Sequence, residues 1–321
     1  MPVTVIPPQY MGGKESPVVK LADSGILEME INLGQPARSV NMLYDCAGRE
    51  TFLPASLTAK GTSYSMVITH RGTWRDLLNI GGLKVEQEFQ FYDEEVGRLG
   101  LNVDQTGQPL FNNIVNRRML GMQIFSTLLT RVNGQLMGEL RVGELEKSLK
   151  GAQLRYNQVL LDELGWSLRV FDVRMGQEYL GYKGRVVIDT LTPYVVVPVV
   201  IFTAIAQLLK MPIMLDKDVL MAKPVHCKGL RKLPPLHFAI ETDEFVWDSA
   251  HYIISTDDGQ CRLALAGFDA HVDGMPVWIF GTSFFVDRAT VFDLQTGHIG
   301  LTDYEADARQ DEVVMLVKDA L

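Results

Sequence analysis

Two stretches of the sequence, SVNMLYD at residues 39–45 and GRVVID at residues 184–189, decide the fold. Each is a short hydrophobic strand pattern that ends in an aspartate, and a proline follows nine residues after each aspartate. A later apolar strand with a glycine occurs in both halves, RLGL at residues 98–101 and WIFG at residues 278–281. The two aspartates lie 144 residues apart, about the length of one domain. The repeated order indicates a chain of two duplicated lobes.

The remaining sequence predicts a mainly β protein. Residues 26–33 alternate apolar and polar side chains and stop at the turn sequence GQP, which is typical of a half-buried strand. Residues 110–118 and 199–209 have the apolar spacing of amphipathic helices. Many short strands with few helices favour a sandwich or barrel. Further short strands are predicted at residues 66–69, 136–142, 168–173, 236–240 and 251–254.

The composition excludes several classes of protein. With 321 residues, 47% of them hydrophobic and 21% charged, the chain can bury a sizeable core and is not a disordered protein. Its 30 basic and 39 acidic residues give a net charge of -9, and the basic residues form only short, isolated groups, so we expect no nucleic-acid binding. The longest apolar run, residues 195–209, is shorter than the roughly 20 residues that cross a membrane, so we expect no membrane span.

Other common chemistries lack their motifs. The three cysteines form no CxxC pair, so we expect no metal site. Neither GxGxxG nor a P-loop occurs, and we expect no cofactor. The serine-hydrolase elbow GxSxG is also absent. The first ten residues lack the pattern of an uncleaved signal peptide, and no Asn-x-Ser/Thr acceptor occurs, which leaves the compartment open.

In their order and spacing, these motifs resemble the pepsin-like aspartic proteases, from about residue 25 to residue 304. The resemblance implies a mainly β, bilobal pepsin-like acid-protease fold, with two pseudo-symmetric β-barrel-like lobes and a few short helices. It places the N-terminal lobe at residues 1–158 and the C-terminal lobe at residues 159–321. It is carried by the opening strand and turn at residues 26–36, the start of the flap at 68–73, the Gly-rich strand at 138–144, and the C-terminal segments 278–281, 290–293 and 299–301.

The resemblance makes Asp45 and Asp189 a pair of facing carboxylates that share one proton. Repulsion between close like charges keeps one of them protonated. The charged one activates water, and the protonated one polarises the scissile carbonyl. From the residues alone, each aspartate could also end its strand in a turn; the duplicated context favours the pair.

The first aspartate motif departs from the family pattern, in which Thr-Gly and then Ser or Thr follow the aspartate. Here Asp45 is followed by Cys46, Ala47 and Gly48. Cys46 offers only a weak thiol donor where the family has a threonine hydroxyl. Ala47 adds a methyl group at the family's glycine position, and Gly48 lacks the following hydroxyl. Cys46 without an identifiable histidine partner is expected to be a small buried residue rather than a reactive thiol.

The second motif departs at one position. Thr190 keeps the hydroxyl that braces the two aspartate loops, and Thr192 keeps the hydroxyl that position 48 has lost. Leu191 stands at the family's glycine position, where we expect its side chain to overfill the space above the carboxylates.

The flap is expected to be short. His70 stands where the family has a tyrosine, and the Gly81-Gly82 pair follows eleven residues later. A truncated flap would exclude water poorly. His70 could replace an acid or base, but a surface histidine on a short hairpin is favoured. Trp74 could serve as an exposed anchor for a partner, although packing onto its own lobe is favoured.

The resemblance also implies a disulfide between Cys227 and Cys261, 34 residues apart. In a reducing compartment the same residues would be two buried thiols.

Two functions remain open. The first is a protease homologue that has lost efficient catalysis and acts as a binding or structural subunit, with a protein or peptide held between the lobes or on the surface. The alternative is a divergent, active aspartic endopeptidase that uses Asp45 and Asp189. The first is favoured because the residues after both aspartates and the flap are altered.

Overall fold

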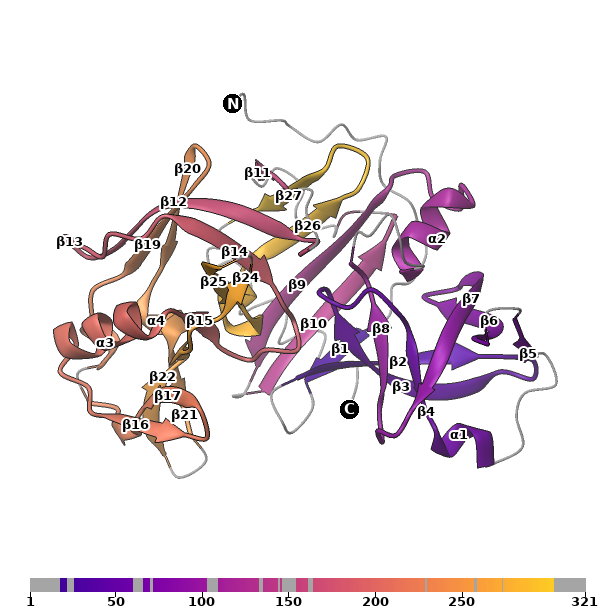
Figure 1. The fold of residues 1–321 in the computed structure, drawn as a ribbon, viewed down its shortest axis with the longest axis horizontal. Helices are drawn as coiled ribbons and strands as arrows, with labels where there is room; N and C mark the ends of the chain where they lie inside the picture. Colours follow the sequence, from indigo (N-terminus) through magenta and orange to yellow (C-terminus); the bar gives the residue numbers. More distant parts are fainter. Residues whose placement is uncertain are drawn as a thin grey trace.

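In a computed structural model of the protein, two lobes flank a central sheet (Figure 1). The lobe drawn in indigo and purple is built from the first part of the chain, and the orange lobe from the second. The structure describes residues 18–21, 26–59, 66–69, 72–102, 109–132, 135–143, 145, 154–160, 164–228, 230–256, 259–272 and 274–302.

The first half of the chain contributes β1 (Val18–Leu21), β2 (Leu27–Leu33), β3 (Arg38–Asp45), β4 (Phe52–Pro54), α1 (Ser56–Ala59), β5 (Val67–Ile68), β6 (Trp74–Ile80), β7 (Leu83–Tyr92), β8 (Gly97–Gly100), α2 (Leu110–Asn116), β9 (Ile124–Val132) and β10 (Gln135–Val142).

The second half contributes β11 (Arg155–Gln158), β12 (Ser167–Met175), β13 (Glu178–Tyr179), β14 (Gly184–Ile188), β15 (Val195–Val197), α3 (Val199–Leu208), β16 (Ile213–Asp216), β17 (Val219–Ala222), β18 (Val225–His226), η3 (Leu230–Lys232), β19 (Leu236–Ile240), β20 (Asp243–Trp247), α4 (Ser249–Tyr252), β21 (Ile253–Ser255), β22 (Gln260–Leu263), β23 (Leu265–Gly267), β24 (His271–Val272), β25 (Met275–Phe280), η4 (Thr282–Phe285), β26 (Ala289–Asp293) and β27 (His298–Leu301).

The two lobes repeat one strand order. In the first lobe the strands run β2-β3-β8-β4-β7-β6-β5, and in the second they run β12-β14-β25-β15-β23-β17-β16. The directions match as well: β3 is parallel to β8, as β14 is to β25, and β4 is parallel to β7, as β15 is to β23. The predicted duplication and the mainly β, bilobal fold are therefore confirmed.

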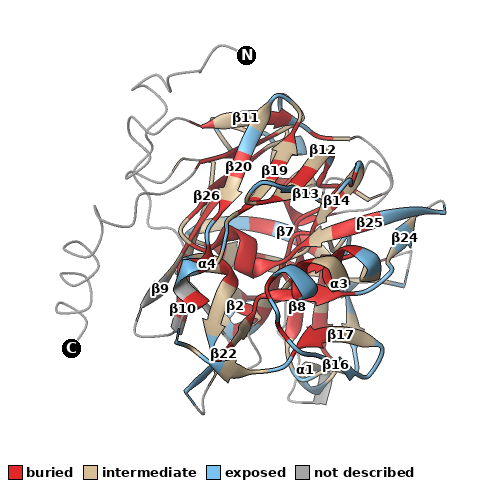
Figure 2. Cartoon of the chain, turned by 90° about the vertical axis from the view of Figure 1, so that its left-hand side faces the viewer, coloured by how far each residue is buried: buried red, intermediate tan, exposed pale blue. Residues whose placement is uncertain are grey.

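The core follows from the alternation of the strands. In β2 the burial pattern alternates along its length, so one face of the strand lies on the core and the other faces outward. In the second lobe, Phe238 contacts the rings of Trp278, Phe280 and Phe284 at centroid distances between 5.2 and 5.8 Å. Figure 2 shows buried residues along the interior strands, and α3 with both buried and exposed residues.

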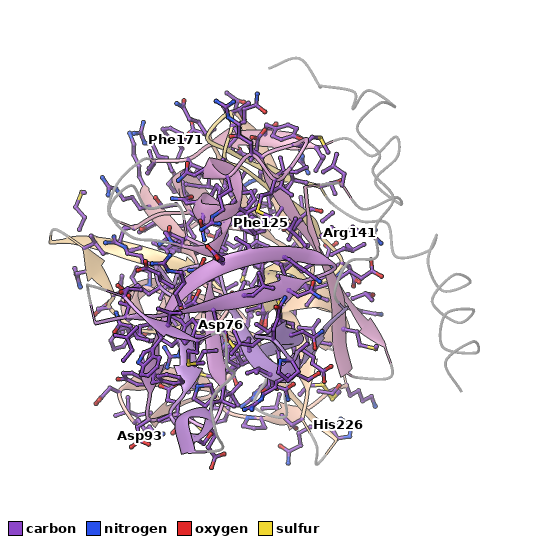
Figure 3. The ribbon with its side chains drawn as sticks, turned by 90° about the vertical axis from the view of Figure 1, so that its right-hand side faces the viewer. Asp76, Asp93, Phe125, Arg141, Phe171 and His226 are labelled. Atoms are coloured by element: carbon purple, nitrogen blue, oxygen red, sulfur yellow. A yellow bond between two sulfur atoms is a disulfide. The ribbon has the colours of Figure 1, made fainter. Side chains whose placement is uncertain are left out.

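A central sheet joins the lobes. Its strand order is β11-β27-β26-β9-β10-β1, so β26 and β27, from the end of the described chain, complete a sheet begun by β9 and β10. Phe125 on β9 stacks on Phe292 on β26 with ring centroids 4.4 Å apart, and Trp166 packs edge-on against both rings. Phe125 lies near the middle of the molecule in Figure 3. The expected ranges 1–158 and 159–321 thus share one sheet.

The predicted elements agree with the structure except at the ends of three of them. The predicted helices form as α2 and α3, each ending one or two residues early. The strand predicted at residues 251–254 is wrong in its first half, because His251 and Tyr252 belong to α4. Tyr252 is fully buried, and its hydroxyl donates to the Pro234 carbonyl at 2.7 Å. The alternation of apolar and polar residues in the sequence does not encode this tertiary contact. Among the described residues, no helix is long and apolar enough to cross a membrane.

Candidate active site

The two aspartates lie at equivalent places in the repeat. Asp45 is the last residue of β3, and Asp189 directly follows β14. Each strand pairs with a parallel partner, β3 with β8 and β14 with β25, and each aspartate stands where its strand gives way to a loop. The aspartates therefore project from the same edge of each lobe.

Thr190 ties the two loops together across the lobe boundary. Its hydroxyl donates to the Tyr44 carbonyl at 2.5 Å and accepts the Cys46 backbone N–H at 3.0 Å. Thr190 is 3% exposed, so both bonds are shielded from water. Cys46 occupies the matching position on the other loop, and burial raises the pKa of its thiol well above the usual range. Burial likewise raises the pKa of Tyr44.

Asp45 is a buried carboxyl group with both hydrogen bonds on one oxygen. Its Oδ1 accepts the backbone N–H of Ala47 at 3.0 Å and of Gly48 at 2.7 Å. The residue is 6% exposed. Burial raises the pKa of Asp45 to about 6, and the nearby charge of Asp189 adds to this rise, while the Gly48 N–H opposes it.

Asp189 has a different hydrogen-bond pattern. Its Oδ1 accepts the backbone N–H of Leu191 at 2.9 Å, and its Oδ2 accepts the Thr192 hydroxyl at 2.7 Å. Asp189 is half-buried. Ala47 and Leu191 are thus equivalent backbone donors, but Asp45 has a second backbone donor in Gly48, and among the described residues only Asp189 has a side-chain hydroxyl donor.

Position 48 has no room for a side chain. A Cβ atom built on Gly48 would lie 2.3 Å from Oδ2 of Asp45. The sequence predicts that Leu191 overfills the space above the carboxylates; the tight contact that the structure shows is between position 48 and the Asp45 carboxyl group. Ala47 and Leu191 are half-buried rather than enclosed.

Two further glycines sit under the aspartate loops at equivalent positions. A Cβ on Gly100 would meet the carbonyls of Gly48 and Glu50, and one on Gly281 would meet those of Thr192 and Tyr194, all within 2.7 Å. These are the glycines of the repeated apolar strands, so the repeat in the sequence reflects close backbone packing beneath each aspartate.

Asn102 also supports the first loop, and sequence reasoning missed it. Its side-chain amide donates to the Ala47 carbonyl at 2.8 Å, and its backbone N–H donates to the Gly48 carbonyl at 3.0 Å. Asn102 is 2% exposed. The only available signal was its place two residues after Gly100, directly behind the repeated motif.

The flap hairpin is formed by β5 and β6, with Ile68 opposite Trp74. Its turn closes through the Thr69 N–H, which donates to the Thr73 carbonyl at 2.8 Å. The Gly81-Gly82 pair belongs to the next hairpin, between β6 and β7, so the distance from His70 to these glycines does not measure the flap loop. His70 itself lies outside the described residues.

Trp74 packs onto its own lobe. Its ring lies edge-on to Phe91 with centroids 5.5 Å apart, and the side chain is half-buried. This arrangement is the one favoured from the sequence, and it leaves Trp74 a poor anchor for a partner.

Cys227 and Cys261 form a disulfide, which joins the end of β18 to its pairing partner β22. Cys46 is the free, buried cysteine. In the described part of the chain, no group of histidine, cysteine, aspartate and glutamate side chains is arranged to hold a metal ion.

A family model of eukaryotic aspartyl proteases matches residues 35–304, which include both aspartate loops and every strand of the central sheet except β1. The chain belongs to the eukaryotic aspartyl protease family. Cathepsin E-B of Xenopus laevis is 23% identical over 85% of this chain and 78% of its own length. Renin of Rattus norvegicus is 22% identical over 84% of this chain and 77% of its own.

The fold of this aspartyl protease homologue is also found among solved structures. The aspartic proteinase from Irpex lacteus superposes with a TM-score of 0.77, covering 91% of this chain and 97% of that one. At 14% identity, this likeness concerns the fold alone. The resemblance inferred from the motifs is thereby confirmed.

Proposed function

We propose that this aspartyl protease homologue is impaired in proteolysis and acts as a binding or structural subunit that holds a protein or peptide at the dyad. The observation that supports this proposal is the unequal hydrogen bonding of the two carboxylates. Thr192 donates a hydroxyl hydrogen bond to Asp189, whereas Gly48 offers none to Asp45 and has no space for a side chain.

The inequality matters because the two carboxyl groups must exchange roles during hydrolysis. The carboxylate that takes a proton from water must later act as an acid, and its partner must do the reverse. A pair whose members differ in hydrogen bonding favours one arrangement of the proton over the other, and this preference adds to the barrier of the step that reverses it. Ala47 and Leu191 carry side chains where the family has glycine, and their backbone N–H groups donate to Asp45 and Asp189.

An active endopeptidase is the second candidate, and three observations favour it. Both aspartates are present, their loops are joined through Thr190, and the raised pKa of Asp45 keeps a proton on the pair below about pH 6. These are the minimum requirements for acid-base hydrolysis by two carboxyl groups.

A cleavage assay separates the two candidates. Purified protein is incubated with denatured protein substrates between about pH 3 and 7, the range in which a carboxylate pair can hold one proton. We expect the wild type to show no cleavage that depends on Asp189. Asp189→Asn should therefore cleave the substrates no less than the wild type does. The control variant is Asp93→Asn, because Asp93 is exposed and follows the end of β7 rather than either aspartate strand. Cleavage that is lost in Asp189→Asn and kept in Asp93→Asn would establish the endopeptidase.

A binding measurement tests the other half of the proposal. The probe is a peptide with a central secondary hydroxyl group, which imitates the tetrahedral intermediate. We expect the wild type and Asp93→Asn to bind this peptide without cutting it, and Asp189→Asn to bind it weakly. Equal binding by all three proteins would place the partner surface away from the dyad.

A further inference from the structure

A positively charged patch surrounds one aromatic side chain on the outward face of the second lobe. Phe171 lies on β12, where the register with β19 shifts between Val170 and Asp172. The guanidinium group of Arg169 lies 5.9 Å from the centroid of the Phe171 ring, and the ammonium group of Lys183 lies 5.8 Å from it. Both cationic side chains are exposed. Two positive charges thus lie beside one ring at the surface.

The pairing of two strands explains why these side chains share a face. Along β12 the exposed Arg169 stands between the buried Leu168 and Val170, so its side chain lies on the outward face. β12 pairs with β14 in the second lobe, and Arg169 is directly opposite Arg185 (Figure 1). Residues directly opposite in an antiparallel pair project from the same face. Arg185 therefore adds a third positive charge to the patch, in a chain whose net charge is -9.

The charges of Arg169 and Lys183 are not neutralised within the described part of the chain. Neither residue forms an ion pair with a described acidic side chain; their recorded side-chain contacts are those with the ring. Asp172 lies close by on β12, and the Glu241 N–H donates to the Arg169 carbonyl at 3.4 Å. Neither of these two carboxylates is paired with Arg169 or Lys183, so both cations keep their full charge.

The next arginine of β12 shows the paired alternative. Arg174 donates to both carboxylate oxygens of Glu244, at 2.9 and 2.7 Å, and these bonds lower the pKa of Glu244. Arg169 has an aromatic ring in place of such a carboxylate. A cation–π contact leaves the N–H groups of the guanidinium unused, so Arg169 can still donate to an anion from outside the chain.

We propose that Arg169, Phe171 and Lys183 form a docking site for an acidic peptide segment of a partner protein. The two cations bind carboxylates of the segment, and the ring packs against the chain between them. Because both cations lie within about 6 Å of one centroid, they are at most about 12 Å apart, which two glutamates two positions apart in an extended peptide can span.

The docking site is separate from the dyad. Arg185 stands four residues before Asp189, about 13 Å along the direction of β14, and Lys183 precedes Arg185. The inference therefore does not rest on the proposed function.

The size of the patch and the charge of the whole chain favour a peptide over a larger anionic surface. Recognition of an anionic membrane by charge uses clusters of about four to eight basic residues. Here three cations surround one ring. The net charge of -9 also repels an extended anionic surface more than it repels a short segment.

Binding of an acidic peptide is measured by fluorescence anisotropy with the whole protein. The probe is a dye-labelled ten-residue peptide in which glutamate alternates with glycine, and the reference peptide has glutamine in place of glutamate. We expect the wild type to bind the glutamate peptide about tenfold more tightly, and this difference to shrink between about 20 and about 150 mM NaCl. Equal affinity for the two peptides would overturn the proposal.

Two charge-matched double variants locate the site. Arg169→Gln with Lys183→Gln should weaken binding of the glutamate peptide about tenfold, because two exposed charge pairs are lost. The control is Lys217→Gln with Lys223→Gln, which removes the same charge from exposed positions after β16 and β17 and should change the affinity less than about twofold. Phe171→Leu keeps an apolar side chain without the ring and should weaken binding about threefold. Equal losses in the two double variants would overturn the proposal.

Two measurements on the wild type exclude other sites and partners. An excess of the hydroxyl-bearing peptide, which is directed at the dyad, should not displace the glutamate peptide; displacement would overturn the proposal. Vesicles that contain phosphatidylserine should not bind the protein, and binding of vesicles without binding of the glutamate peptide would overturn it in favour of a membrane. If the glutamate peptide binds at the patch and the hydroxyl-bearing peptide does not bind at all, the docking site stands and the proposed binding at the dyad is wrong.

Discussion

Thr190 is the residue through which the two aspartate loops contact each other. Its hydroxyl donates to the Tyr44 carbonyl and accepts the Cys46 N–H. Removal of the hydroxyl leaves both of these buried groups without that partner. We expect Thr190→Val to lower the free energy of unfolding by about 2–3 kcal/mol, measured by urea denaturation. The matched control is Thr203→Val, because among the described residues the Thr203 hydroxyl donates only to the Val199 carbonyl within α3. If both substitutions lower the free energy of unfolding equally, the contact across the lobes stabilises the fold no more than a hydroxyl hydrogen bond within a helix.

Asp45 makes the stability of the fold depend on pH. Its pKa rises from 3.8 to about 6 on folding, so between these values the folded state binds more protons than the unfolded state. Stability from this group is therefore fully present below about pH 4 and falls as the pH rises to about 6, by about 3 kcal/mol in total.

Asp45→Asn should flatten this part of the profile. The carboxamide is neutral at every pH, so the free energy of unfolding of the variant should lose the decline between pH 4 and 6. Parallel profiles for the variant and the wild type would contradict the burial of a titrating carboxyl group at this position.

For single residues, the sequence predicted the positions of the two aspartates but not the residues that surround them. Asp45 and Asp189 could be identified because a strand followed by an aspartate occurs twice. The contact of Gly48 with Asp45 and the support from Asn102 depend on how one loop lies over another strand. Such through-space packing leaves no periodic signal in the chain.

The disulfide is the covalent link between elements of the second lobe. It closes a loop of 34 residues between the end of β18 and β22, which runs through η3, β19, β20, α4 and β21. By the chain-entropy model, such a loop restricts the unfolded chain enough to stabilise the fold by about 3–4 kcal/mol.

Replacing both cysteines tests this contribution. Cys227→Ser with Cys261→Ser should lower the free energy of unfolding by about that amount, and a reducing agent should do the same to the wild type but not to the variant. The control is Cys46→Ser in the wild type, which leaves the disulfide in place. An effect of the reducing agent on the double variant would point to the remaining thiol, Cys46, instead.

Strands and helices were predictable where one face of the element meets the core. Alternation located β2, because it has one buried and one outward face. The segment at residues 251–254 failed because α4 is a single turn held by the buried Tyr252. The pairing of β9 with β26 could not be derived from the residues, since strands so far apart in the sequence share no local pattern.

At the scale of the whole molecule, the central sheet makes the lobes depend on each other. β9 has β10 on one side and β26 on the other, and Phe125 stacks on Phe292 across the second pairing. Residues 1–158 expressed alone would leave that edge of β9 and its aromatic side chain exposed. We expect this fragment not to fold cooperatively, as measured by circular dichroism and thermal denaturation.

Co-expression with residues 159–321 is the control, and it should restore a folded complex because β26 and β27 are supplied in trans. A cooperative thermal transition of the isolated first fragment would contradict the prediction. It would show that the first lobe is stable without the strands from the end of the described chain.

The pairing of β9 with β26 also determines how long β9 stays unpaired on that side during protein synthesis. A ribosome that adds about 5–20 residues per second makes β26 some 10–30 s after β9. For that interval the growing chain carries an open strand edge with apolar side chains beside the ribosome, where it can pair with another nascent chain. Chaperone contact with residues 124–132 during translation would protect this edge until its partner strand is made.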